Sequence, residues 1–339
     1  MTKILIVGAG SIGTALAVLL ARNGFDVWLW DRSKEVVNSI NKLHENTRYY
    51  PGIKLPDNIV ATSSMDIVKS AEVIFLAVPS HATREVARKL KKAGLRKSTI
   101  IINLAKGIEY PPLKRLSQVI WEETKNKSII VMSGPNFADE ILLGYPSGTT
   151  IAGYNYEAVL RVKSLLENDH FIVQVSNDVI GVEMGGVLKN IYAIAMGICS
   201  ALGINENAYF FILSEAFLEM RDIIIKMGGY ESSLFLSSGF GDLCLTSSSN
   251  KSRNRILGFL AGKKMLGVVN NISVVFEGKK SVKAIREFCH TKNIPCPVID
   301  FVYSVLIERI QPYKAFKELW KNIARRFSQV QVTSSVARI

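Results

Sequence analysis

The hydrophobic pattern changes character about halfway along the chain. In the first half, short β-branched and apolar runs alternate with amphipathic stretches of helical period, which is typical of a parallel, doubly wound sheet. The amphipathic stretches predict helices over residues 13–23, 34–44 and 82–93, and residues 46–56 predict a loop. The apolar runs predict strands over residues 3–7, 27–30, 73–78, 99–103 and 128–133.

Helical patterns dominate the second half. A strand-like run over residues 171–175 is followed by the polar Ser176-Asn177-Asp178, which marks the change. A chain of 339 residues exceeds the size at which one core keeps growing, so we expect two domains. Helices are predicted over residues 179–201, 207–227, 253–266, 278–292 and 299–309.

These patterns predict an α/β fold with two domains and a tail. The first domain, residues 1–178, is expected to be a Rossmann-type doubly wound sheet. The second, residues 179–327, is an all-α C-terminal domain that binds the substrate. Residues 328–339 have no helical stripe and predict a loose tail.

Composition narrows the choice of partners. The 42 basic and 29 acidic residues give a formal charge of +13, which favours anionic ligands. The basic residues are dispersed without an aromatic ladder, so we do not expect nucleic acid as the main partner. The four cysteines lack a C-x-x-C spacing and the histidines lack metal-ligand spacing, so reduced thiols and no metal site are expected.

The sequence gives no sign of export or of a membrane span. Gly8, Gly10 and Gly13 interrupt the apolar N-terminal stretch, which would otherwise resemble a signal peptide. No later apolar run is long enough and clean enough to cross a bilayer. We therefore expect a cytoplasmic protein.

A glycine turn near the N-terminus predicts a dinucleotide site. Gly8, Gly10 and Gly13 follow the first predicted strand and open the first predicted helix. In that context the first glycine makes the turn, the second admits a pyrophosphate, and the third packs helix against strand. The pattern predicts NAD(P) binding.

The second strand ends in Asp31-Arg32, where a Rossmann site reads the adenosine ribose. Asp31 could accept from a ribose 2′-hydroxyl and favour NAD. Arg32 could meet a 2′-phosphate and favour NADP. Both cofactors therefore stay open.

Two lysines are candidates for the chemistry. Lys106 follows a predicted strand, and ligands of open α/β sheets bind at such strand ends. Lys189 lies on a helical face of small, uncharged residues that includes Gly185 and Gly186. Adjacent glycines are costly in a helix, so they indicate close approach of another body. A lysine desolvated there would have a lowered pKa suited to proton transfer, whereas the ordinary alternative is a lysine whose ammonium reaches water.

A second group of polar residues lies further along the chain. Gly241-Asp242 places a carboxylate after two glycines. Ser252 is a candidate N-cap, and the helix start with Arg253 and Asn254 could hold a phosphate, although a capped, exposed helix start would look the same.

Taken in order, these motifs resemble the bacterial-type NAD(P)-dependent glycerol-3-phosphate dehydrogenases from residue 3 to about residue 310. The resemblance implies reversible reduction of dihydroxyacetone phosphate, a small phosphorylated substrate, to sn-glycerol 3-phosphate for glycerophospholipid synthesis. It leaves a homodimer open. The matching positions are residues 8–13, Asn46, Tyr49, and residues 51–52, 78–80, 106–109, 133–135, 137–138, 181–190, 241–242, 252–254 and 277–278.

The resemblance also implies roles for individual residues. Lys189 is the implied catalytic lysine, Asp242 its carboxylate partner, and Lys106 a catalytic residue that contacts both substrate and cofactor. The implied cofactor-binding positions are Gly8, Gly10, Ser11, Ile12, Gly13, Arg32, Lys106, Ala138, Arg253, Val275 and Glu277. The implied substrate-binding positions are Lys106, Gly134, Asn136, Lys189, Asp242, Ser252, Arg253 and Asn254.

Four positions depart from the usual pattern of this family. Ile12 stands where an aromatic residue is common, Tyr50 where leucine is common, and Asn136 where serine is common. Glu215 stands where arginine is frequent, which reverses the charge and predicts altered ion pairing or an altered subunit contact.

Two other functions remain as alternatives. The first is another two-domain NAD(P) dehydrogenase, acting on a hydroxy acid or on ketopantoate. The second is a binding protein that senses NAD(P) without turnover, although it would not need Lys106, Lys189 and Asp242 together.

Overall fold

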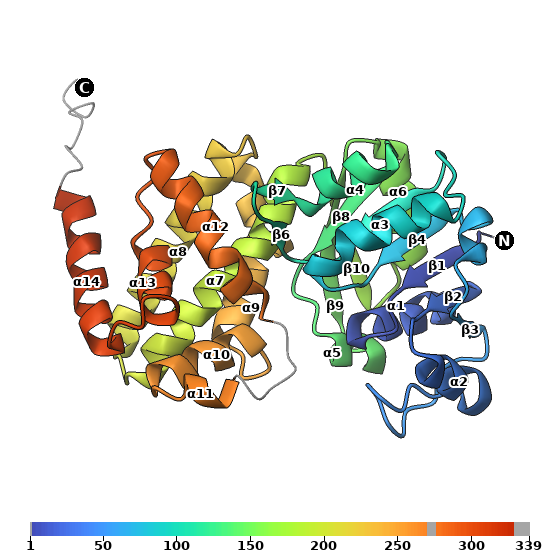
Figure 1. Ribbon diagram of the computed structural model, residues 1–339, viewed down its shortest axis with the longest axis horizontal. Helices are drawn as coiled ribbons and strands as arrows, with labels where there is room; N and C mark the ends of the chain where they lie inside the picture. Colours follow the sequence, from blue (N-terminus) through green and yellow to red (C-terminus); the bar gives the residue numbers. More distant parts are fainter. Residues whose placement is uncertain (1, 270–275, 329–339) are drawn as a thin grey trace. The chain divides into compact units, whose positions relative to one another are not determined.

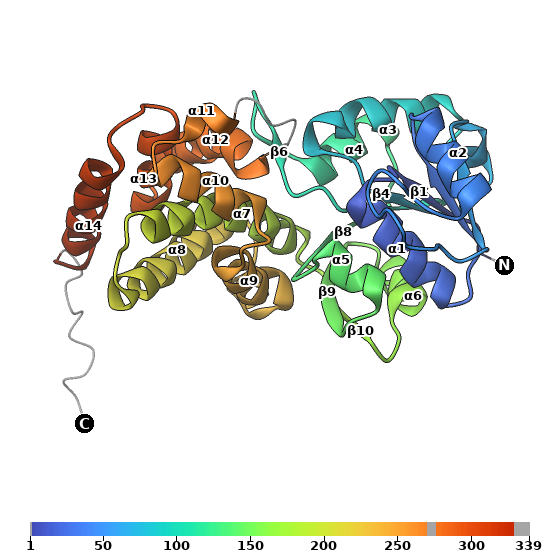
Figure 2. The same cartoon turned by 90° about the horizontal axis from the view of Figure 1, so that it is seen from below.

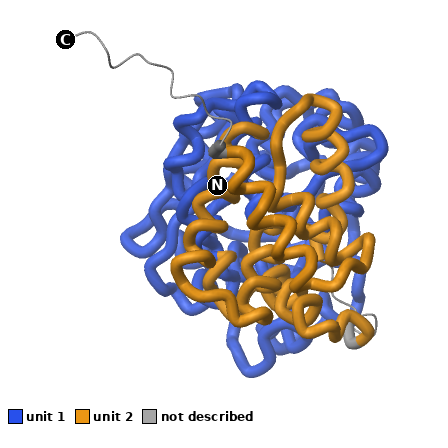
Figure 3. The backbone as a smooth tube through the Cα atoms, turned by 90° about the vertical axis from the view of Figure 1, so that its left-hand side faces the viewer, with its two compact units in different colours: residues 1–189, 224–245 blue, residues 190–223, 246–339 orange. Residues whose placement is uncertain are grey.

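The computed structural model describes residues 2–269 and 276–328, which form two compact units (Figure 3). The first unit comprises Met1–Lys189 and Ile224–Leu245, and the second comprises Asn190–Ile223 and Thr246–Ile339. The helix α7 (Val179–Ala201) begins in the first unit and ends in the second. The compact units thus divide α7 itself, whereas the predicted domain division follows residue 178.

An eight-stranded sheet forms the centre of the first unit. Its strand order is β10-β9-β8-β5-β4-β1-β2-β3, and neighbouring strands are parallel except for the antiparallel pair β8 and β9. The predicted Rossmann-type fold is therefore confirmed. The strands are β1 (Ile4–Val7), β2 (Val27–Trp30), β3 (Ile59–Thr62), β4 (Val73–Leu76), β5 (Ile100–Asn103), β8 (Ile129–Ser133), β9 (Ser147–Gly153) and β10 (Phe171–Ser176).

The sequence pattern missed two of these strands for physical reasons. β3 is a short edge strand with Val60 exposed, so it offers little apolar periodicity. β9 reads Ser-Gly-Thr-Thr-Ile-Ala-Gly, and its glycines argue against a strand although its side chains are mostly buried.

Helices cover both faces of the sheet (Figure 1). The core on one face includes side chains of α1 (Ser11–Arg22), α2 (Lys34–Leu43) and α6 (Tyr156–Leu166). The core on the other face includes side chains of α3 (Thr83–Lys92) and α4 (Leu116–Thr124). A short antiparallel hairpin, β6 (Ile108–Glu109) with β7 (Lys114–Arg115), precedes α4, and α5 (Ala138–Leu143) follows β8.

The described part of the second unit is helical, as predicted. Within it α13 packs against α12 and α14 (Figure 2). The predicted helix over residues 253–266 is divided, because the chain turns at Lys264 with a positive φ of 62°. The helices after α7 are α8 (Glu206–Lys226), whose end lies in the first unit, α9 (Asp242–Ser248), which begins in the first unit, and α10 (Arg253–Gly262), α11 (Leu266–Val269), α12 (Glu277–Thr291), α13 (Pro297–Leu306) and α14 (Pro312–Ser328).

Two predictions concern the ends of this helical part. The helix α14 was not predicted, and it ends at Ser328, the first residue of the predicted loose tail. Residues 329–339 of that tail lie outside the described residues.

The expectation that no later segment could span a bilayer needs correction. Among the described residues, α7 is long and apolar enough to do so by length and composition alone. However, 94% of its apolar window is buried inside the protein, as in the core helix of a globular protein.

Candidate functional site

The glycine turn after β1 lies at the carboxyl edge of the parallel strands. Gly8 has a φ of +113°, and a Cβ there would lie 2.6 Å from the Ala77 carbonyl oxygen after β4. A Cβ on Gly13 would lie 1.9 Å from the Gly8 carbonyl oxygen. The protein itself therefore requires glycine at both positions.

Gly10 is different, because the protein does not require glycine there. Its φ is −76°, and a Cβ would meet nothing within 4 Å. It is the N-cap of α1 and provides no side-chain cap, so the backbone N–H groups of Ser11 and Ile12 begin the helix without a side-chain acceptor from the cap. An uncapped helix start beside open space fits a pyrophosphate.

Two polar side chains, the buried Asn46 and the partly buried Asp31, brace this turn. Asn46 donates to the Ala9 carbonyl oxygen at 2.9 Å and to the Thr14 hydroxyl at 2.8 Å. Asp31 accepts from the Ala9 backbone N–H at 3.0 Å and from that of Ser33 at 2.8 Å. Both carboxylate oxygens of Asp31 thus fix the backbone, which the ribose interpretation did not foresee. Arg32 is exposed and interacts electrostatically with Glu85 of α3.

The structure brings the three predicted catalytic residues together within the first unit. Lys106 follows β5, Lys189 lies on α7, and Asp242 begins α9 directly after a π-helical turn over Ser237–Gly241. Lys106 Nζ lies 2.9 Å from Asp242 Oδ2 and 3.1 Å from the Gly134 carbonyl oxygen. Lys189 Nζ pairs with Asp242 Oδ1. One carboxylate therefore bridges two ammonium groups, which leaves a net positive charge.

Burial sets the protonation of this cluster. Lys189 and Asp242 are both buried. Desolvation, which is the largest influence, and the neighbouring Lys106 together lower the pKa of Lys189 to about 7, against the opposing attraction of Asp242. An amine of that pKa can donate or accept a proton near neutral pH.

The adjacent glycines of α7 are explained by close packing around these lysines. A Cβ on Gly186 would lie 2.6 Å from the Ser133 hydroxyl and 3.4 Å from Lys106 Cγ. A Cβ on Gly185 would lie 2.9 Å from the Ser238 carbonyl oxygen. The predicted close approach of another body is therefore confirmed: the loops after β5 and β8 and the π-helical turn pack against α7.

Two buried carboxylates hold these elements, and sequence reasoning gave neither a role. Asp178 accepts from Gly181 N–H at 2.8 Å, from Tyr230 N–H at 2.7 Å and from the Ser233 hydroxyl at 2.7 Å. It thereby joins the start of α7 to the segment that leads to Asp242. Its position directly before a predicted helix was the available sequence signal.

Glu183 joins the other side of α7 to the start of α4. It accepts from the Ser117 backbone N–H at 2.8 Å and pairs with Arg115 at 3.0 Å. Its side chain is almost fully buried, at 2% exposure. The available sequence signal was a glutamate inside an apolar helical pattern, because a buried carboxylate needs hydrogen-bond or ion-pair partners.

Of the other predicted site positions, Gly134, Asn136 and Ala138 lie in the segment after β8 and make different contacts. Gly134, with a φ of +154°, presents its carbonyl to Lys106. The Asn136 amide donates to the Gly148 carbonyl oxygen at 2.8 Å, so it braces the loop against β9. Ala138 begins α5 and packs on the sheet core. Val275 lies outside the described residues.

The remaining predicted positions belong to the second unit. Ser252 caps α10 by accepting from the Arg255 backbone N–H, and Arg253 is exposed at the first helical position. Asn254 is buried and has both amide ends engaged: it donates to Asn190 Oδ1 at 3.0 Å and accepts from Gly278 N–H at 3.2 Å. Glu277 begins α12.

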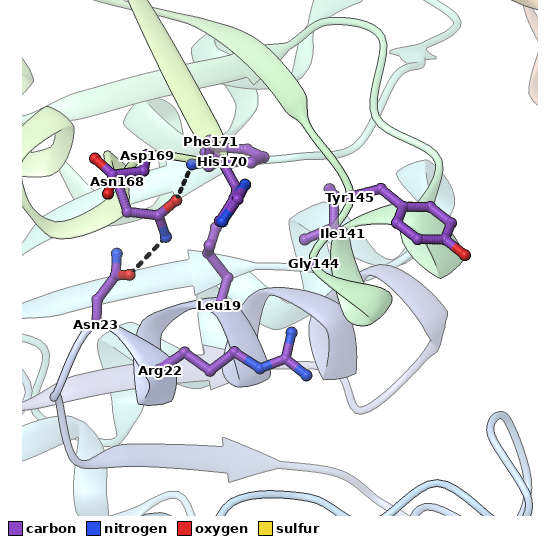
Figure 4. A pocket seen from close by; sticks show the side chains of 10 residues that line it. All are labelled: Leu19, Arg22, Asn23, Ile141, Gly144, Tyr145, Asn168, Asp169, His170 and Phe171. Atoms are coloured by element: carbon purple, nitrogen blue, oxygen red, sulfur yellow. Dashed lines mark hydrogen bonds between the residues drawn. The ribbon is translucent and has the colours of Figure 1, made fainter.

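A separate hollow of the first unit contains none of the predicted site residues (Figure 4). Its lining comes from the end of α1, from α5 and from the turn before β10. Asn168 donates to Asn23 across it at 2.7 Å.

The glycine turn and the lysine pair that shares Asp242 at the carboxyl edge of this sheet define a Rossmann-type NAD(P)-dependent dehydrogenase. Comparisons with known proteins make the class more specific. Family models described as the N-terminus and the C-terminus of NAD-dependent glycerol-3-phosphate dehydrogenase match residues 3–159 and 178–317. The chain belongs to this family.

Individual relatives agree over nearly the whole chain. Glycerol-3-phosphate dehydrogenase [NAD(P)+] of Clostridium perfringens is 38% identical over 91% of this chain and 94% of its own. The enzyme of that name from Methanothermobacter thermautotrophicus is 40% identical over 94% and 98%. The crystal structure of glycerol-3-phosphate dehydrogenase from Coxiella burnetii has a TM-score of 0.88 at 31% identity, covering 94% of this chain and 99% of that one.

Proposed function

We propose that this chain catalyses the reversible reduction of dihydroxyacetone phosphate to sn-glycerol 3-phosphate with NAD(P)H, in the cytoplasm, as a step toward glycerophospholipids. The observation that carries the proposal is the Lys189–Asp242–Lys106 cluster, in which Lys189 and Asp242 are buried. It offers a proton donor of suitable pKa beside a net positive charge, which suits a carbonyl oxygen that becomes an alkoxide.

The three residues divide the chemistry. Lys189 donates its proton to the C2 oxygen of the substrate during reduction and recovers a proton from the alcohol during oxidation. The carboxylate of Asp242 raises the pKa of Lys189, against the lowering by desolvation, and so keeps part of the lysine population charged near neutral pH. Lys106, which is less buried, extends the positive charge toward substrate and cofactor.

NAD(P) fits the residues at the glycine turn. The open space at Gly10 and the start of α1 would hold the pyrophosphate, and the bound nicotinamide supplies the hydride. Arg32, exposed at the end of β2, would meet a 2′-phosphate. If it does, Arg32→Ala raises the KM for NADPH much more than that for NADH, whereas equal losses assign it to adenine stacking.

In the second unit the start of α10 is the proposed phosphate site. Arg253 is exposed there, and the N-terminus of the helix favours an anion. Ser252 and Asn254 support this site through the backbone of α10, because Ser252 caps the helix and Asn254 holds it to Asn190 and Gly278.

Initial rates test the proposed function. Dihydroxyacetone phosphate and ketopantoate are compared, each with NADH and with NADPH. We expect turnover of the phosphorylated ketone with at least one cofactor and only weak turnover of ketopantoate. Faster ketopantoate reduction supports the other dehydrogenase, and cofactor binding without reduction of either ketone supports a sensor. Light scattering on the same sample tests whether the chain forms a homodimer, which the sequence leaves open.

A further inference from the structure

Three different metal-ligand side chains meet in the second unit, where α12 ends and α13 begins. His290 lies in the last turn of α12, Cys296 is the N-cap of α13, and Asp300 lies in its first turn. One ligand atom from each residue lies within 4.8 Å of the others. The proposed dehydrogenase chemistry uses none of these side chains.

A second thiol adjoins this group. Cys289, the residue before His290, is fully buried and its side chain hydrogen-bonds with that of Cys296. The buried Tyr192 hydroxyl interacts electrostatically with both cysteines and has no hydrogen-bond partner in the described part of the chain. The thiols therefore lie where a polar atom of the protein interior is left unsatisfied.

The spacing of these atoms suits tetrahedral coordination. Zinc–ligand bonds of about 2.0–2.3 Å place the ligand atoms roughly 3.3–3.8 Å apart. His290 Nε2 already lies 3.0 Å from Asp300 Oδ1, and the two thiols are in hydrogen-bond contact. The three ligand atoms of His290, Cys296 and Asp300 are therefore near the spacing that one ion requires, and Cys289 adjoins them through Cys296.

Arg286 orients the carboxylate. Its Nε donates to Asp300 Oδ1 at 2.7 Å, and its guanidinium lies 4.4 Å from the centroid of the Tyr303 ring. Since the bonds from Arg286 and His290 both end on Oδ1, Oδ2 is the oxygen available to a metal. One thiolate, one carboxylate and a divalent cation sum to zero charge.

Asp300 also lines a cavity of about 350 Å³, together with Arg286, Pro297 and Ser304. This cavity gives a small ion a route to the cluster from solvent. Access and a second shell that orients a ligand are both features of real metal sites.

We propose that His290, Cys296 and Asp300 bind one thiophilic divalent cation, Zn²⁺ being the best match, and that the ion joins α12 to α13. A thiolate, an imidazole and a carboxylate favour zinc over magnesium or calcium, and solvent can take the fourth tetrahedral position. Binding releases the Cys296 thiol proton to solvent. The proposed reduction does not depend on this site.

Cobalt titration of the tag-free, reduced and metal-stripped full chain tests this site. We expect one Co²⁺ per chain, with thiolate-to-cobalt charge-transfer absorption and strong tetrahedral visible bands, both removed by Zn²⁺. His290→Ala, which changes a half-exposed side chain and should leave the fold intact, is expected to weaken binding at least about 10-fold. Cys296→Ser is expected to abolish the charge-transfer band.

Matched controls lie outside the cluster. Cys244→Ser and His170→Ala change a cysteine and a histidine of the first unit and should leave the cobalt spectrum and its affinity unchanged. Zn²⁺ should raise the unfolding midpoint of the parent and not that of His290→Ala. Cobalt bound without thiolate absorption, or with equal affinity in parent and His290→Ala, overturns the proposal. A Cys289–Cys296 disulfide on mild peroxide treatment, in protein that binds no cobalt when reduced, also overturns it and assigns the thiols to redox chemistry.

Discussion

The protonation of Lys189 is decided by burial more than by its partner. Desolvation is the largest influence on its pKa, and Asp242 offsets that influence only in part. The resulting value of about 7 lets one side chain serve as acid in reduction and as base in oxidation. A fully charged surface lysine would serve only as an acid.

Opposite pH dependences should therefore be found in the two directions. Reduction needs the ammonium form, so kcat/KM for dihydroxyacetone phosphate should fall about 10-fold per pH unit above a pKa of about 7. Oxidation needs the neutral amine, so its kcat/KM should fall below the same pKa. Initial rates from pH 5.5 to about 9 in both directions measure the two limbs.

Variants of the neighbouring residues should move these limbs in opposite senses. Asp242→Asn removes the anion that raises the pKa of Lys189, so the limb should move to lower pH. Lys106→Met removes a cation that lowers that pKa, so the limb should move to higher pH. If both variants lose rate without moving the limb, the titrating group is not Lys189.

Arg253 should discriminate between phosphorylated and unphosphorylated ketones. A guanidinium–phosphate contact is worth about 1.5–3 kcal/mol, so Arg253→Ala should lower kcat/KM for dihydroxyacetone phosphate by about 10- to 150-fold. Dihydroxyacetone offers no phosphate, and its slow reduction should hardly change. Equal losses for both ketones would assign Arg253 to the cofactor instead.

At the scale of elements, the position of Lys106 depends on the β6–β7 hairpin that follows it. Ion pairs hold both strands of this hairpin. Arg84 of α3 binds Glu109 of β6 through two hydrogen bonds of 2.6 Å and also pairs with Glu122 of α4. At the other end, Arg115 pairs with Glu183 of α7, the helix that carries Lys189. The two lysines are thus fixed to each other through Glu183 as well as through Asp242.

Glu183→Gln should lower kcat without weakening cofactor binding. The amide keeps the size of the side chain but loses the charge that pairs with Arg115, and small misplacements of catalytic groups cost up to about 100-fold in rate. Breaking the buried pair should also destabilise the fold by about 3–5 kcal/mol. The kcat, the Kd for NADH and the unfolding midpoint are compared.

A surface pair serves as the matched control for that substitution. Asp66 and Lys69 form an exposed pair at 3.6 Å, so Asp66→Asn should change neither kcat nor stability appreciably. A Glu183→Gln enzyme that is less stable but turns over at the parental rate would show that Glu183 has no positioning role.

The sequence predicted the helices and strands better than it predicted the side-chain contacts that join them. A long apolar stretch predicted α7 with its observed bounds, and a short apolar run predicted β2 correctly, because burial selects apolar residues over the whole length of such elements. The lysines were found through the family resemblance and the glycines beside Lys189. The bracing roles of Asp31, Asp178 and Glu183 could not be predicted, because each depends on which distant backbone groups the fold brings within hydrogen-bond reach.

At the scale of the whole molecule, the reversed charge at Glu215 is compensated within the chain. Glu215 of α8 is buried, and burial raises its pKa. Arg326 of α14 lies 3.5 Å from Glu215 and 2.6 Å from Asp222, so it fastens α14 to α8. Arg326 lies beyond residue 317, where the family match ends. Of the two expected consequences of Glu215, altered local ion pairing is therefore the one observed.

Arg326→Met should destabilise the helical unit by about 1–3 kcal/mol, because Glu215 is left buried without its cation. Asp222 keeps its contact with Arg221 at 2.8 Å. Adding Glu215→Gln should recover much of the loss, since the buried charge is then gone. Thermal unfolding of the parent, both single variants and the double variant measures the coupling. Strictly additive changes would mean that the pair does not hold α14.

The most direct test of the central claim compares Lys189→Ala with the parent in two measurements on the same samples. Fluorescence titration gives the Kd for NAD(P)H, and initial rates with dihydroxyacetone phosphate give kcat. Because Lys189 acts on the substrate oxygen and lies outside the glycine turn, kcat should fall by about 10²- to 10⁴-fold while the Kd stays within a factor of two or so. A variant that keeps kcat within a few-fold of the parent would contradict the account.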